Sequence, residues 1–129
     1  MMHSVPVEKD EERERPVPSA WRGVFCQIVD RIISGDVSEI GEIPGVEPLS
    51  RSDADRIFAN IFDYGESLVC LPDEAWISSV CQWQLEYWDV LVDLFTTEGE
   101  SDLVLSAKVY EDRGKGYDYK FEIMSVHVP

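Results

Sequence analysis

The chain has little positive charge. Only 11 of its 129 residues are Lys or Arg, against 26 Asp and Glu, so the formal net charge is −15. No Lys or Arg occurs between Ile57 and Ala107, a stretch that contains ten acidic residues. Such a surface repels the phosphates of nucleic acids and of anionic membranes, so we expect neither as a partner.

Histidine is scarce, and the cysteines lack a recognisable spacing. His3 and His127 lie at opposite ends of the chain, and the three cysteines form no CxxC pair. We therefore expect no metal site, and we interpret Cys26, Cys70 and Cys81 as buried free thiols in a reducing cytoplasm. Gly-x-Ser-x-Gly, GxGxxG and Walker sequences are absent, so no catalytic residues and no cofactor are predicted.

Long hydrophobic runs are also missing. No run approaches the length of a membrane span, and no signal-peptide pattern opens the chain. Residues 1–18 are polar, mix both charges and contain prolines, which favours a flexible tail. The length of residues 19–129 suits a single domain with one core, and so does the composition of the whole chain, which is 44% hydrophobic.

The N-terminal half of that domain has helical periodicity. Apolar residues recur every three or four positions over 19–34 and again over 50–65, where Phe58 and Phe62 widen the apolar stripe. Ser19 and Ser50 are predicted N-caps, with Ser52 or Asp53 as competing caps of the second helix, and Gly35 and Gly65 suit the helix ends. Residues 67–71 suggest a short strand and 72–80 a short helix, whereas 81–87 fit either structure.

The C-terminal half alternates with a period of two. Three strands are predicted from Trp88 onward, joined by a turn over 98–102 and a glycine-rich turn over 113–116. The fold class is therefore α+β, with two to three N-terminal helices packed on a C-terminal antiparallel β-meander. This element order resembles the nuclear-transport-factor-2-like fold, which implies a curved, cone-like sheet.

Two sets of residues are candidate sites. One is a partner-binding surface on the sheet face opposite the helices and on the acidic turn, with apolar anchors between carboxylates; it comprises Asp89, Leu91, Asp93, Phe95, Glu98, Glu100 and Asp102. Val104, Tyr110, Met124 and Val126 are expected on the same face. The other is a pocket inside a conical sheet, lined by aromatic residues with an acid at its mouth; it comprises Trp83, Glu86, Trp88, Tyr117, Tyr119 and Phe121.

Three stretches carry a resemblance to a family. The strings DYGESLVCLPDEAW (63–76), WDVLVDLFTTEGESDLVLS (88–106) and SVHVP (125–129) are similar to those of a small acidic bacterial domain family of uncharacterised function. That resemblance implies no activity. Chains of this size and acidity also resemble bacterial toxin-immunity proteins, some of which have the conical α+β fold.

The resemblance and the charge pattern together favour a cytoplasmic, non-enzymatic protein. It would occlude a basic protein partner, such as a toxin domain, through carboxylates that pair with the lysines and arginines of that partner. Two alternatives stay open. One is a conical pocket protein that binds or converts a small molecule, and the other is an adaptor that forms a homodimer through the exposed sheet face.

Overall fold

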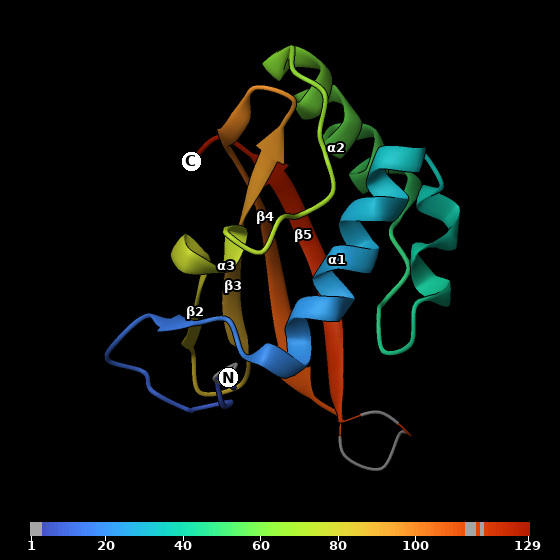
Figure 1. The fold of residues 1–129 in the computed structure, drawn as a ribbon. Helices are drawn as coiled ribbons and strands as arrows, with labels where there is room; N and C mark the ends of the chain where they lie inside the picture. The colour runs from blue at the N-terminus through green and yellow to red at the C-terminus, as the bar shows by residue number, and fades with distance from the viewer. Residues whose placement is uncertain (1–3, 113–115, 117) are drawn as a thin grey trace.

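The protein is built on one five-stranded antiparallel sheet with helices on one face (Figure 1). The structure is a computed structural model that describes residues 4–112, 116 and 118–129. The strands are β1 (Arg15–Pro16), β2 (Val80–Trp83), β3 (Trp88–Thr96), β4 (Gly99–Glu111) and β5 (Tyr119–His127), and they lie in this order across the sheet. The predicted α+β class is confirmed, and the sheet is not closed into a barrel.

The helices follow the predicted spacing. They are α1 (Ser19–Ser34), a 3-10 helix η1 (Val37–Glu42), α2 (Arg51–Tyr64) and the short α3 (Ala75–Ser78). Ser50 caps α2, because its hydroxyl accepts a hydrogen bond from the Asp53 amide. Ser19 is not a cap as predicted: Pro18 holds that position, and the Ser19 hydroxyl accepts from the amide of Val5 instead.

Long-range pairing corrects one predicted strand and settles the one ambiguous stretch. Residues 67–71 were expected as a strand, but only an isolated bridge between Leu68 and Thr96 forms there. Residues 81–87 divide into the end of β2 and a turn that contains Leu85 at a φ of 75°. The predicted turn over 113–116 lies, apart from Gly116, outside the described residues.

The core lies between α1 and the sheet. Trp21, on α1, has its ring centroid 5.2 Å from that of Trp88, on β3, and 5.4 Å from that of Tyr119, on β5. Phe25, one turn further along α1, meets Phe121 at 5.6 Å. These edge-to-face aromatic contacts fix α1 across the middle of the sheet.

An irregularity in β5 changes which residues face the core. Ser106 pairs with Ser125 whereas Ala107 pairs with Ile123, so Met124 is an extra residue in β5. Strict alternation placed Val126 on the outer face, but this bulge turns Val126 into the core, and it has no exposed surface. The prediction for Val126 is therefore wrong.

The N-terminal segment differs from the predicted flexible tail. Arg15 and Pro16 pair with Cys81 and Val80, and Val17 is fully buried. The indole N–H of Trp88 also donates to the Glu8 carbonyl at 2.9 Å. The folded unit therefore begins before residue 19, because partners about 65 to 80 positions away hold this segment.

No helix in the described part of the chain combines the length and hydrophobicity needed to cross a membrane. The β3–β4 hairpin, the C-terminal end of α2 and the C-terminus lie at the same end of the molecule, in the upper part of Figure 1.

Candidate functional site

The outer sheet face holds some of the predicted partner-binding residues but is not uniformly acidic. Asp89 and Leu91 are exposed there, and Leu91 is 37% accessible. Asp89 lies across from Lys108, and Lys108 lies across from Glu122 on β5. Cross-strand neighbours of opposite sign thus balance much of the charge of this face.

Lysine and tyrosine also alternate on this face. The Lys108 ammonium lies 4.6 Å from the Tyr87 ring centroid, and the Lys120 ammonium lies 5.2 Å from that of Tyr110. The two tyrosine rings are 5.6 Å apart. Cation–π contacts of this kind hold the lysines over the sheet, so they remain close to the carboxylates of the face.

Two predicted residues in the C-terminal half of β3 are less available to a partner. Phe95 is only 5% exposed, so it is not the surface anchor predicted; it lies where β3 and β4 leave regular register. The segment 67–69 lies next to Phe95, and the Val69 amide donates a hydrogen bond to the Phe95 carbonyl. Asp93 is half-buried and accepts a hydrogen bond from the Ser78 hydroxyl.

The remaining predicted acids gather at the β3–β4 hairpin. Glu98, Glu100 and Asp102 are exposed, and two further acids from the end of α2 and the residues after it lie beside the hairpin. We call the five residues Asp63, Glu66, Glu98, Glu100 and Asp102 the acidic end. Sequence reasoning missed the first two as site residues, although both belong to the stretch without bases.

Hydrogen bonds join the two halves of the acidic end. The Asp102 amide donates to the Tyr64 hydroxyl at 3.0 Å, which ties the hairpin to the last turn of α2. Thr96 donates its hydroxyl proton to a Glu66 carboxylate oxygen at 2.6 Å, and the Thr96 oxygen accepts from the Glu98 amide. These hydrogen bonds hold the β3–β4 hairpin and the C-terminal end of α2 in a fixed relation, so the carboxylates do not lie on independent loops.

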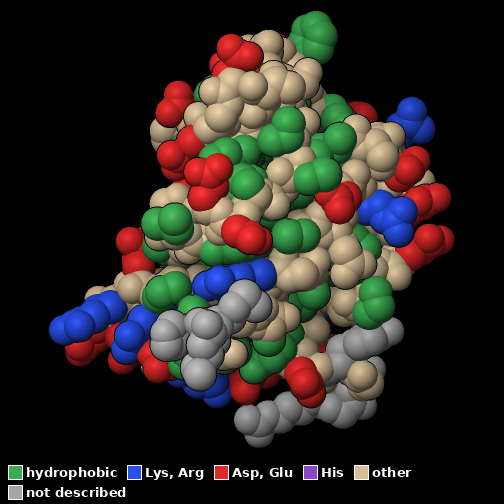
Figure 2. Space-filling model, viewed as in Figure 1, with side chains coloured by type: hydrophobic (Ala, Val, Ile, Leu, Met, Phe, Trp, Pro, Cys, Tyr) green, Lys and Arg blue, Asp and Glu red, His purple; other side chains and the backbone are tan. Residues whose placement is uncertain are grey.

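Cations do not neutralise these acids within the described residues. The ion pairs there use other carboxylates, such as Glu111 with Lys9, Glu39 with Arg31 and Asp53 with Arg56. None of the ten acids between positions 57 and 107 takes part in an ion pair in that described part. In Figure 2 the upper left of the molecule shows acidic side chains without Lys or Arg among them, while basic ones lie at the lower left and at the right.

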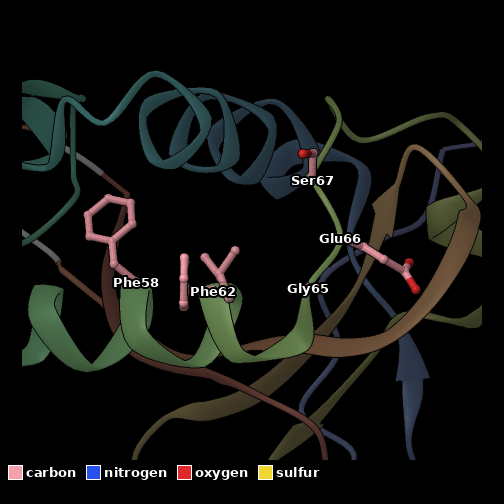
Figure 3. Close-up of a pocket in the computed structure, with 6 residues that line it drawn as sticks. Phe58, Phe62, Gly65, Glu66 and Ser67 are labelled. Carbon is pink, nitrogen blue, oxygen red and sulfur yellow. The ribbon is translucent and has the colours of Figure 1, made fainter.

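An apolar groove opens next to the acidic end. It has a volume of about 610 Å³ and is lined by Phe58, Ile61, Phe62, Gly65, Glu66 and Ser67 (Figure 3). We call it the α2 groove. Figure 3 shows Phe58 and Phe62 projecting from the same side of α2, with Glu66 turned toward the hairpin. Phe62 is 84% exposed, which the stripe read from the sequence did not predict.

The predicted aromatic pocket residues form a packed cluster. Trp21 from α1 contacts Trp88, Tyr119 and Phe121, and the Trp83 ring lies tilted against Trp88 with centroids 4.4 Å apart. Glu86 is exposed in the turn between β2 and β3, and Tyr117 lies outside the described residues. Among the rings that the structure describes, Trp21 packs from α1 against Trp88, Tyr119 and Phe121.

The thiols differ in exposure, and none is activated. Cys81 is buried as predicted, and desolvation raises its pKa to about 11. Cys70 is exposed, contrary to prediction, because it lies in the extended segment after α2. A hydrogen bond with the Asp30 side chain and the charge of that carboxylate raise the pKa of Cys70. Raised pKa values disfavour the thiolate that nucleophilic chemistry requires.

Histidine is also engaged in a local contact. His127 Nδ1 lies 2.7 Å from the Ser125 hydroxyl oxygen on the same strand. Within the described ranges, no three His, Cys, Asp or Glu side chains are arranged to hold a metal ion.

The fold and the site define an α+β protein whose helix-covered meander has, in its described part, an acidic end without ion pairs beside an apolar groove. The chain belongs to the family described as a domain of unknown function (DUF7668), which matches residues 29–129. This match covers both halves of the acidic end and the whole α2 groove. The chain matches no curated protein and no solved structure.

Proposed function

We propose that the protein is a non-enzymatic binding protein that holds a basic protein partner at its acidic end. The partner class is a toxin domain, most simply a nuclease, which this protein would occlude as an immunity protein. The observation that carries the proposal is the acidic end itself, because five carboxylates share one bonded frame and lack ion-pair partners in the described structure.

The chemistry of occlusion follows from what a nuclease needs. A nuclease binds phosphate through lysines and arginines, and carboxylates compete for the same side chains. Charge of one sign on a surface speeds the encounter with an oppositely charged partner, and this effect weakens as salt screens the field. The apolar surface beside the acids would then slow dissociation, since buried apolar contacts carry much of the energy of an interface.

The experiment first searches the genes beside the one for this chain for a basic nuclease domain, and then uses that domain in purified form. We expect stoichiometric inhibition of nuclease activity by the protein and rescue of cells that co-express both. The association rate, measured by stopped flow, should fall about tenfold or more between low and physiological salt. Failure to inhibit such a nuclease at any salt concentration would contradict the proposal.

Two double charge-reversal variants show which acidic residues speed association with the partner. Glu98→Lys with Asp102→Lys should slow association, because it removes two acids of the acidic end and adds two cations. The control is Asp36→Lys with Glu42→Lys, which makes the same change in net charge around η1, away from the hairpin in Figure 1. Equal effects of the two double variants would indicate that net charge alone, not the acidic end, guides the encounter.

A further inference from the structure

The α2 groove bears the apolar residues of a docking site. Phe58, Ile61 and Phe62 occupy positions i, i+3 and i+4 of α2, so their side chains share one face of the helix. Phe62 has 84% of its surface exposed, which is unusual for a large aromatic residue. The volume of about 610 Å³ leaves room for several side chains of another molecule.

The walls of the groove are fixed before anything binds. Asn60 donates its side-chain N–H to the Val126 carbonyl at 2.8 Å, which ties α2 to β5. On the other side, the Thr97 amide donates to the Ser67 carbonyl at 3.0 Å, and the Val69 amide donates to β3. A preformed groove loses little conformational entropy on binding, which favours affinity.

The charges beside the groove define the chemistry of its occupant. Glu66 lines the groove, and Thr96 hydrogen-bonds to both Glu66 and the Glu98 amide, which places the hairpin acids beside it. Asp63, in the last turn of α2, lines a separate hollow with Leu103 and His127. The last turn of α2 carries no basic residue, and a helix C-terminus adds partial negative charge. A second copy of this chain would bring the same carboxylates into contact with these, so like-charge repulsion opposes it.

The backbone of the groove favours a helix over an added strand. Strand addition needs free main-chain donors and acceptors along an edge. Here the Ser67 carbonyl and the Val69 amide already bond to the end of β3, so the groove presents mainly side chains. An amphipathic helix meets a groove of this kind with apolar side chains at helical spacing.

From these observations we infer that the α2 groove receives an amphipathic, basic helix of the protein partner. Its apolar side chains would pack on Phe58, Ile61 and Phe62, and its Lys or Arg residues would lie beside Glu66 and the hairpin acids. This inference rests on the proposed function and adds the recognition mode.

The test is a titration of the full chain with a synthetic helical peptide. The peptide is about five turns long, with Leu on one face and Lys on the other. Two matched peptides replace Lys by Glu, or Leu by Ser. Binding is followed by fluorescence anisotropy, and backbone amide shifts of the isotope-labelled protein locate the site. We expect only the Leu/Lys peptide to bind, with shifts centred on residues 58–67.

Two variants of the protein test the anchor. Phe62→Ala should weaken binding of the Leu/Lys peptide about tenfold, as expected for an interface aromatic residue. Since Phe62 is mostly exposed, the variant should fold normally, which circular dichroism checks. The control is Ile77→Ala, because Ile77 is 86% exposed on α3, outside the groove. Ile77→Ala should leave the affinity unchanged.

Several outcomes would overturn the inference. They are equal binding of the Lys and Glu peptides, amide shifts centred elsewhere, an unchanged affinity for Phe62→Ala, and uptake of a small apolar dye by the groove while the peptide fails to bind. Peptide binding without nuclease inhibition would reject the proposed function and keep the groove as a docking site. Nuclease inhibition that Phe62→Ala leaves intact would reject the groove and keep the proposed function.

Discussion

Two buried tryptophans differ in whether the indole N–H group has a hydrogen-bond partner. The indole N–H of Trp88 donates to the Glu8 carbonyl, whereas that of Trp21 has no hydrogen-bond partner among the described residues. Both rings lie in the same aromatic cluster and are almost fully buried. The pair therefore separates the contribution of a hydrogen bond from that of ring packing.

We predict that Trp88→Phe destabilises the protein more than Trp21→Phe. Both changes remove the same volume of ring, but only the first leaves a carbonyl without its donor, which costs about 1 kcal/mol more. Urea denaturation of the two variants, followed by circular dichroism, measures the difference. Equal free energies of unfolding would show that the bond to Glu8 contributes nothing to stability.

At the scale of elements, the N-terminal segment belongs to the sheet. We predict that Val17→Ala lowers the free energy of unfolding by about 2 kcal/mol, because a fully buried side chain loses two methyl groups. The matched control is Val128→Ala, at a position that is 53% exposed, where the change should stay within about 0.5 kcal/mol. Chemical denaturation of both variants tests this, and a harmless Val17→Ala would restore the interpretation of this segment as a loose tail.

At the scale of the whole molecule, unpaired negative charge opposes folding. The net charge of −15 includes the five carboxylates of the acidic end, which repel one another in the folded state. Added salt screens this repulsion, so Tm should rise by roughly 4 °C between about 0.02 M and 0.5 M NaCl.

The double variant Glu98→Lys with Asp102→Lys provides the comparison for this salt effect. It reduces the repulsion within the acidic end, so its Tm should depend less on salt than that of the natural chain. Differential scanning calorimetry of the two proteins measures both slopes. A Tm that falls with salt in the natural chain would contradict the picture of self-repulsion.

Local patterns in the sequence were enough to predict the regular elements. The 3.6-residue spacing of Trp21, Phe25 and Ile28 predicts α1, and the alternation from Trp88 predicts β3, because each pattern follows from backbone geometry that repeats over a few residues. Ser50, Gly35 and Gly65 mark helix ends for equally local reasons. The stretch without Lys or Arg is a property of the sequence alone.

The position of the site required contacts that no local pattern contains. The bulge at Met124 moves Val126 into the core, and partners distant in the sequence bring residues 8–17 into the fold. Phe58 and Phe62 share a helical stripe, yet only the packing of α2 against β5 leaves Phe62 exposed beside a groove.

The sequence by itself determined the α+β class, both ends of α2, the C-terminal end of α1, the alternation of β3 and the excess of acid, since these depend on neighbours along the chain. Only the tertiary structure decided which acids share one end of the molecule and which lie beside lysines on the outer face. The physical reason is that charge and exposure at a site depend on residues brought together through space, as Asp102 and Tyr64 are.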